Sequence, residues 1–85
     1  MKTARILIVE DEAPHATDLK FRVETLGHHV LSVVDSGEKA LHLVQRFRPD
    51  LVLMDVGLRG EADGVETARA IWEKTKTPFV YITAY

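Results

Sequence analysis

Acidic side chains follow two separate apolar segments of this 85-residue sequence. Glu10, Asp11 and Glu12 come directly after the run 6–9, and Asp55 ends the run 50–55. If these runs are neighbouring strands of one sheet, at least three carboxylates meet in a small site. Converging carboxylates repel one another unless a cation joins them. Mg²⁺ suits such a site, because it binds through few carboxylates and keeps waters and phosphate oxygens as its other ligands.

A carboxylate held beside Mg²⁺ can also act as a nucleophile and form an aspartyl-phosphate. The transferred phosphoryl group then needs its oxygens neutralised by the metal and by hydrogen-bond donors. Thr83, at the end of the last apolar run, could donate its hydroxyl, and the backbone of the glycine-containing loop after Asp55 could donate N–H groups. The plainer interpretation is that each acid ends a strand in solvent or caps a helix, and that the loop glycines serve turns.

The elements that must position these groups are visible in the hydrophobic pattern. Short apolar, β-branched runs predict strands at 5–9, 29–34, 50–55 and 79–83. Between them, apolar residues recur at helical spacing and predict the inward-facing positions of three helices. These positions are Ala16, Leu19, Val23 and Leu26 in the first helix, Ala40, Leu41, Val44 and Phe47 in the second, and Val65, Ala68, Ile71 and Trp72 in the third.

Boundary residues support the same division. Pro14 is tolerated in a first helical turn, Gly27 is a reasonable helix stop, and Ser36 is a plausible N-cap. Pro49 ends the second helix. Strands that alternate with helices predict a parallel sheet with right-handed crossovers and helices on its faces. Ligands of such sheets bind beyond the carboxyl ends of the strands, where the acids stand.

Composition excludes several classes of protein. With 46% hydrophobic and 28% charged residues the chain is typical of one small globular domain. Without cysteine it has neither a disulfide framework nor a thiolate zinc site, and its apolar runs are too short for a membrane span or a secretory signal. With 11 basic and 13 acidic residues, the chain lacks the excess of basic residues that is typical of nucleic-acid-binding domains. A cytoplasmic location is therefore expected.

The chain resembles the receiver domain of two-component response regulators. The matching segments are 6–12, 49–55, 63–66 and 78–84, so the resemblance spans essentially residues 1–85. It implies a flavodoxin-like, doubly wound α/β fold. It also implies a signalling switch that takes a phosphoryl group from a sensor histidine kinase or a phosphotransfer protein, and not an enzyme in the ordinary sense.

The resemblance assigns a role to each residue of the site. Asp55 matches the phosphoacceptor, and Asp11 matches a direct Mg²⁺ ligand. Glu10 matches the second acidic position, commonly Asp in the family, which acts through metal-bound water. Gly57 matches the position whose backbone carbonyl binds the metal.

Two further positions match the residues that contact the phosphoryl group. Thr83 matches the switch hydroxyl, and Ala84 matches the small residue that leaves room beside it. The family fold has five strands in the order 2-1-3-4-5, whereas four are expected here, in the order 2-1-3-4. The catalytic Lys at the end of strand five has no counterpart in residues 1–85. The expectation is a piece of a longer receiver, whose fourth strand presents an open sheet edge.

A second function stays open: a phosphorylation-independent interaction module that self-associates through this edge. A dinucleotide-binding enzyme is disfavoured, because the turn 10–14 carries acids where phosphate binding wants glycines. An aspartate-nucleophile phosphatase would want a second Asp where Gly57 stands. His15 is either an exposed first-turn residue or a modulator of phosphoryl lifetime. The output domain and the cognate kinase leave no trace in the sequence.

Overall fold

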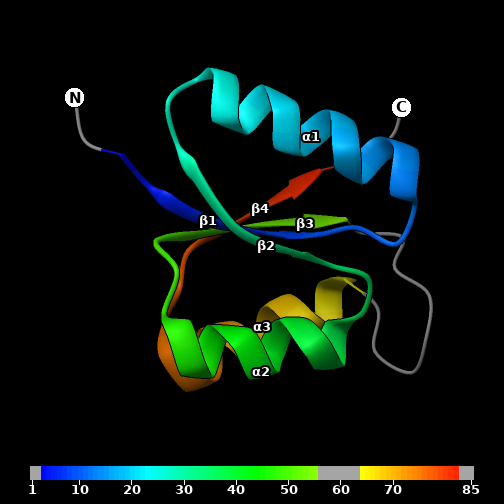
Figure 1. Ribbon diagram of the computed structural model, residues 1–85. Helices are drawn as coiled ribbons and strands as arrows, with labels where there is room; N and C mark the ends of the chain where they lie inside the picture. The colour runs from blue at the N-terminus through cyan, green and yellow to red at the C-terminus, as the bar shows by residue number, and fades with distance from the viewer. Residues whose placement is uncertain (1–2, 56–63, 83–85) are drawn as a thin grey trace.

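The computed structural model describes residues 3–55 and 64–82, and these form a sheet with helices on both faces (Figure 1). Strands and helices alternate along the chain, as the pattern predicts. The elements are β1 (Arg5–Val9), α1 (Ala13–Thr25), β2 (His29–Val34), α2 (Gly37–Phe47), β3 (Leu51–Asp55), α3 (Gly64–Thr75) and β4 (Phe79–Ile82).

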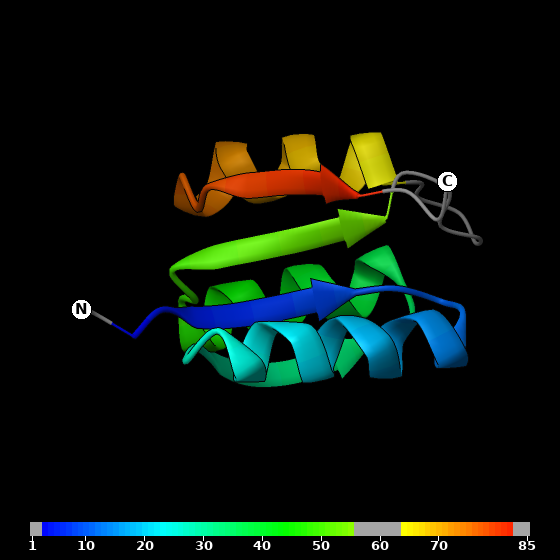
Figure 2. The same ribbon diagram turned by 90° about the horizontal axis from the view of Figure 1, so that it is seen from above.

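The strands are parallel and lie in the order β2-β1-β3-β4, which confirms the predicted topology. Helix α1 covers one face of the sheet, and α2 and α3 cover the other (Figure 1). Seen from above, the visible strand arrows point the same way, and α1 begins at the edge toward which they point (Figure 2). The carboxyl ends of the strands therefore share one edge with the first turn of α1.

Two apolar cores lie on the two faces of the sheet, because successive side chains of a strand point to opposite faces. In β1, Ile6 and Ile8 pack toward α1, whereas Leu7 and Val9 pack toward α2 and α3. All four are at most 4% exposed. Since β1 is central and covered on both faces, it needs the continuous apolar run that its sequence provides.

The predicted helix boundaries have a structural basis. After α1, Gly27 adopts φ +92°, and the N–H groups of Gly27 and His28 donate to the carbonyls of Glu24 and Val23. This is the hydrogen-bond pattern of a Schellman stop, which favours glycine. The Ser36 hydroxyl accepts a hydrogen bond from the backbone N–H of Lys39 at 3.3 Å, which confirms Ser36 as the N-cap of α2.

The predicted inner face of the third helix was partly wrong. Val65 and Trp72 are 52% and 47% exposed. The buried stripe of α3 is instead Gly64, Thr67, Ala68 and Ile71. It follows the same helical spacing, but it is rotated toward a glycine and a threonine, which an apolar pattern does not count.

Three other expectations near element ends were also wrong. Leu26 is 69% exposed because it lies at the C-cap, beyond the last turn of α1, and Phe47, the last residue of α2, is 47% exposed. Asp50 precedes β3 instead of opening it, and its Oδ2 accepts a hydrogen bond from the Arg5 N–H at 2.7 Å. The fourth strand is described to Ile82, so its predicted last residue, Thr83, lies outside the described residues.

Strand β4 forms an edge of the described sheet. Val80 pairs with Leu53, which packs in the core beneath α1, so Val80 faces the α1 side. It is nevertheless 48% exposed, and its neighbour Tyr81 is 42% exposed. In the part of the chain that the structure covers, no helix is long and apolar enough to cross a membrane.

Candidate functional site

The predicted convergence of carboxylates is present at the carboxyl edge of the sheet. Val9 of β1 pairs with Met54 of β3, so Glu10 and Asp55 follow side by side on the two central strands. One carboxylate oxygen from each of Glu10, Asp11 and Asp55 lies within 4.8 Å of the others. Sheet pairing thus brings together residues that are 45 positions apart, and the site that they form is large enough for one small cation.

Glu10 is the buried member of this cluster, with 4% of its surface exposed. Its backbone N–H donates to the carbonyl of Val34 at 2.9 Å, which ties it to the end of β2. Its Oε1 accepts a hydrogen bond from the backbone N–H of Glu12 at 3.1 Å. Its Oε2 is buried and accepts no hydrogen bond within the described residues, although Nδ1 of His15 lies 3.1 Å away.

Burial is the main reason that the pKa of the Glu10 carboxyl is raised above its ordinary value. The N–H of Glu12 opposes this effect, because it stabilises the ionised form. The negative charge of Asp55 raises the pKa further, and His15 lowers it. Full ionisation of the carboxylates in this site is therefore unfavourable. A bound cation would offset the repulsion between their negative charges.

The donor set fits Mg²⁺. The converging ligands are carboxylate oxygens, which hard divalent cations prefer. The buried Oε2 of Glu10 is a strong acceptor without a hydrogen bond in the described part of the chain, and such a group is costly unless something binds it. Asp11 and Asp55 are only partly buried, so a ligand can reach them from solvent.

An open hollow of about 410 Å³ lies beside the acids, between the start of α1, the end of β2 and the start of α2. Glu10 and Asp11 line it, and so do Asp35 and Lys39. Nζ of Lys39 lies 2.9 Å from Oδ1 of Asp35, and this hydrogen-bonded ion pair lowers the pKa of the Asp35 carboxyl. The hollow leaves the Asp11 side of the acidic cluster accessible.

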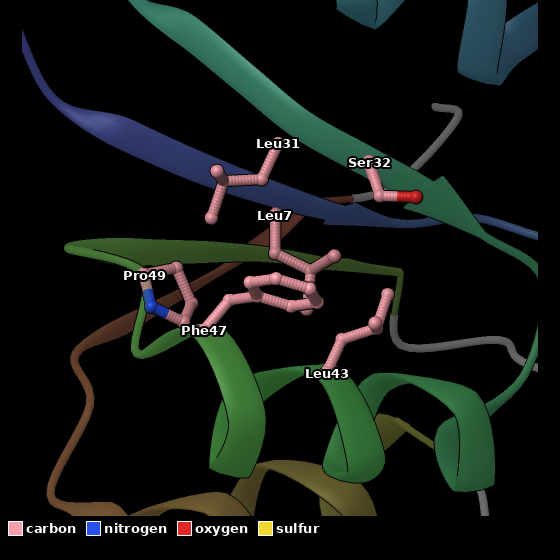
Figure 3. A pocket seen from close by; sticks show the side chains of 6 residues that line it. All are labelled: Leu7, Leu31, Ser32, Leu43, Phe47 and Pro49. Atoms are coloured by element: carbon pink, nitrogen blue, oxygen red, sulfur yellow. The ribbon is translucent and has the colours of Figure 1, made fainter.

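A separate pocket of about 210 Å³ lies between α2 and the sheet (Figure 3). Its lining is apolar except for Ser32, and it includes Phe47 and Pro49, which precede β3. These residues stand at the opposite end of the strands from the acids, so this pocket does not belong to the acidic site.

Several predicted residues lie outside the described ranges: Gly57, Thr83 and Ala84. Among the described histidines, Nδ1 of His28 accepts a hydrogen bond from the N–H of Ala4 at 3.0 Å, and His29 is exposed. His15 is only partly exposed because its ring lies against Glu10, a contact that the sequence spacing alone did not reveal.

Comparison with known proteins gives a consistent family. The family model for "Response regulator receiver domain" matches residues 6–85. The transcriptional regulatory protein PdtaR of Mycobacterium tuberculosis is 36% identical over 81 residues, which are 95% of this chain and 39% of that protein. The phyllosphere-induced regulator PhyR of Methylorubrum extorquens is also 36% identical, over 94% of this chain and 30% of that protein.

The fold has close counterparts among solved structures. The signal receiver domain of a modulated diguanylate cyclase from Desulfovibrio desulfuricans superposes with a TM-score of 0.92 and 39% identity. The match covers 99% of this chain and 67% of that structure. The chain thus spans between about a third and two fifths of the length of these two curated relatives.

Proposed function

Because the chain belongs to the response regulator receiver domain family, we propose that it is a phosphorylatable switch whose acceptor is Asp55. The observation that carries this proposal is the meeting of Glu10, Asp11 and Asp55 within 4.8 Å at the carboxyl edge of the sheet. Asp55 ends the central strand β3 and is partly exposed, so its carboxylate can reach an incoming phosphoryl group.

Mg²⁺ is the proposed cofactor, and when bound it would neutralise the charge of the transferred phosphoryl group. Asp11 and Asp55 would hold it directly, together with the backbone carbonyl of Gly57, and Glu10 would act through a metal-bound water. The carboxylate of Asp55 attacks phosphorus as the bond to the donor's histidine nitrogen breaks. Thr83 and Ala84 would contact the phosphoryl group, as their positions in the family imply.

The proposed donor is a phosphohistidine on a sensor histidine kinase or a phosphotransfer protein. The hollow beside Asp11 leaves the acidic edge open to such a partner. Receiver domains are signalling domains, so the proposed chemistry is acceptance of one group and not turnover of a substrate.

Intact mass under native conditions tests the proposal, with acetyl-phosphate as donor and with Mg²⁺ present or omitted. The protein should gain one phosphoryl group only with Mg²⁺, and Asp55→Asn should abolish the gain. Asp50→Asn is the matched control. It makes the same change at the other end of β3, where the side-chain oxygen can still accept from Arg5. Labelling that persists in Asp55→Asn would assign the acceptor elsewhere.

The second candidate is a module that works by association without phosphorylation. The exposed Val80 and Tyr81 at the β4 edge favour it. Native mass spectra in which oligomers form while no phosphoryl group is gained would support this candidate over the first.

A further inference from the structure

The imidazole of His15 contacts the buried acid of the site. Nδ1 of His15 lies 3.1 Å from Oε2 of Glu10, and the side chains are 21% and 2% exposed. The contact follows from chain geometry: α1 begins at Ala13, directly beyond the acidic turn, so its first turn carries His15 back over the end of β1. His15 does not itself join the group of side chains that converge within 4.8 Å.

We propose that His15 is a positioning residue of the metal site, which fixes the carboxylate of Glu10 through its ring nitrogen. The proposal rests on the proposed function, because it concerns how the same site holds its cation. A side chain that hydrogen-bonds to a metal ligand, without touching the metal, orients that ligand. Removing such a side chain commonly weakens metal binding.

Glu10 needs such fixing more than an aspartate would. Its side chain has one more rotatable bond, so ordering its carboxylate costs more conformational entropy. One oxygen is already held, because Oε1 accepts from the N–H of Glu12. His15 contacts the other oxygen. Together, two contacts on two different oxygens define the plane of the carboxylate.

The ring can complete this contact at little cost. Nδ1 of His15 and Oε2 of Glu10 lie 3.1 Å apart, but Oε2 accepts no hydrogen bond among the described residues. The two atoms are therefore close enough for a hydrogen bond but not aligned for one. The outer torsion of a histidine side chain is broad, so a small rotation aligns an Nδ1–H donor with the oxygen. A carboxylate oxygen has room for two donors, which leaves Oε2 able to accept a metal-bound water as well.

The test measures Mg²⁺ affinity by isothermal titration calorimetry. His15→Leu removes the nitrogen while keeping an apolar side chain, and it should weaken Mg²⁺ binding by about tenfold. His15→Asn places an amide N–H near the position of Nδ1 and should restore most of the affinity. His42→Leu makes the same change on the exposed face of α2 and serves as the matched control.

A second readout separates positioning from a general effect on folding. His15→Leu should remain folded by circular dichroism, and about tenfold more Mg²⁺ should be needed for the same rise in its melting temperature, whereas His42→Leu should match the unsubstituted protein. Unchanged Mg²⁺ affinity in His15→Leu overturns the inference, and so does a His15→Asn variant as weak as His15→Leu.

The same titrations distinguish this failure from failure of the proposed function. If Mg²⁺ binds and Asp11→Asn abolishes binding, the proposed metal site stands whatever His15 does. If the unsubstituted protein binds no Mg²⁺, the metal site and the role of His15 are both overturned.

Discussion

At the scale of single residues, Glu10 is the carboxylate whose surroundings are least favourable to its charge. Its carboxylate is buried next to the charge of Asp55, and both conditions disfavour the ionised form. The same conditions favour a cation that neutralises the group. A divalent cation bound at the proposed site would therefore recover part of the free energy that ionised Glu10 costs the metal-free protein.

The raised pKa of Glu10 predicts a pH dependence with a definite sign. Between the ordinary pKa of a glutamate and the raised pKa, the folded protein binds more protons than the unfolded chain. Without Mg²⁺, the free energy of unfolding contributed by Glu10 therefore falls as pH rises through this window, and it is constant below and above it. Glu10→Gln should gain stability relative to the unsubstituted protein over the same window.

Urea denaturation from about pH 2 to about pH 8 without Mg²⁺ measures this difference and also covers the lowered pKa of Asp35. Asp35→Asn is a useful control because Lys39 lowers the pKa of Asp35, so its effect has the opposite sign. The unsubstituted protein should lose its small advantage over Asp35→Asn as pH falls through the lowered pKa. A Glu10→Gln difference that stays flat across the range would contradict the raised pKa of Glu10.

At the scale of elements, the site depends on where strands end and helices begin. Strand β1 ends at Val9 and β3 at Asp55, and their parallel pairing aligns the two ends. Helix α1 begins only after the acidic turn, which places His15 over Glu10. Helix α2 begins beside the hollow that borders the acids, and Lys39 in its first turn lines that hollow.

The N-cap of α2 offers a test at this scale. The Ser36 hydroxyl accepts from the N–H of Lys39, a group that otherwise has no partner within the helix. Ser36→Ala should lower the free energy of unfolding by about 1 kcal/mol, measured by urea denaturation. Ser36→Asn keeps a capping oxygen and should stay close to the unsubstituted protein. Equal losses in both variants would show that the cap is not what Ser36 contributes.

At the scale of the whole molecule, the two faces of the sheet are covered unequally. Helices α2 and α3 lie on one face and α1 on the other (Figure 1). On the α1 side, Val80 of the edge strand β4 is 48% exposed. A half-exposed apolar edge strand is a template for pairing with a second chain.

The 85-residue chain should therefore self-associate as its concentration rises, and Val80→Lys should shift it toward the monomer. A charge on an edge strand opposes further pairing. Light scattering coupled to size-exclusion chromatography measures the change. Phe21→Lys, on the outer surface of α1 and 68% exposed in the unsubstituted protein, is the control. An equal shift toward the monomer in both variants would indicate nonspecific association instead of pairing at β4.

Much of the fold was predictable from local pattern. The apolar runs predicted the strands, and alternation with helices predicted a parallel sheet. The strand order that the structure shows was implied by the resemblance to receiver domains. Ser36 and Gly27 act as the predicted cap and stop. Such signals are readable because they depend on residues close in sequence. The exposure of Val65 and Trp72 was not predictable in this way, because apolar spacing defines a stripe but not the exact rotation of the helix against its neighbours.

The candidate site, like the fold, was predictable from the sequence only in part. Acids at strand ends followed from the sequence, and so did their meeting once the strand order was inferred. The depth of Glu10, the hydrogen bond from Glu12 and the contact with His15 depend on where α1 starts in space. Sequence fixes which groups are available, since that is a matter of covalent chemistry. Burial and distance are set by packing among elements far apart in the chain, and they alone show that the Glu10 carboxylate is buried and that His15 contacts it.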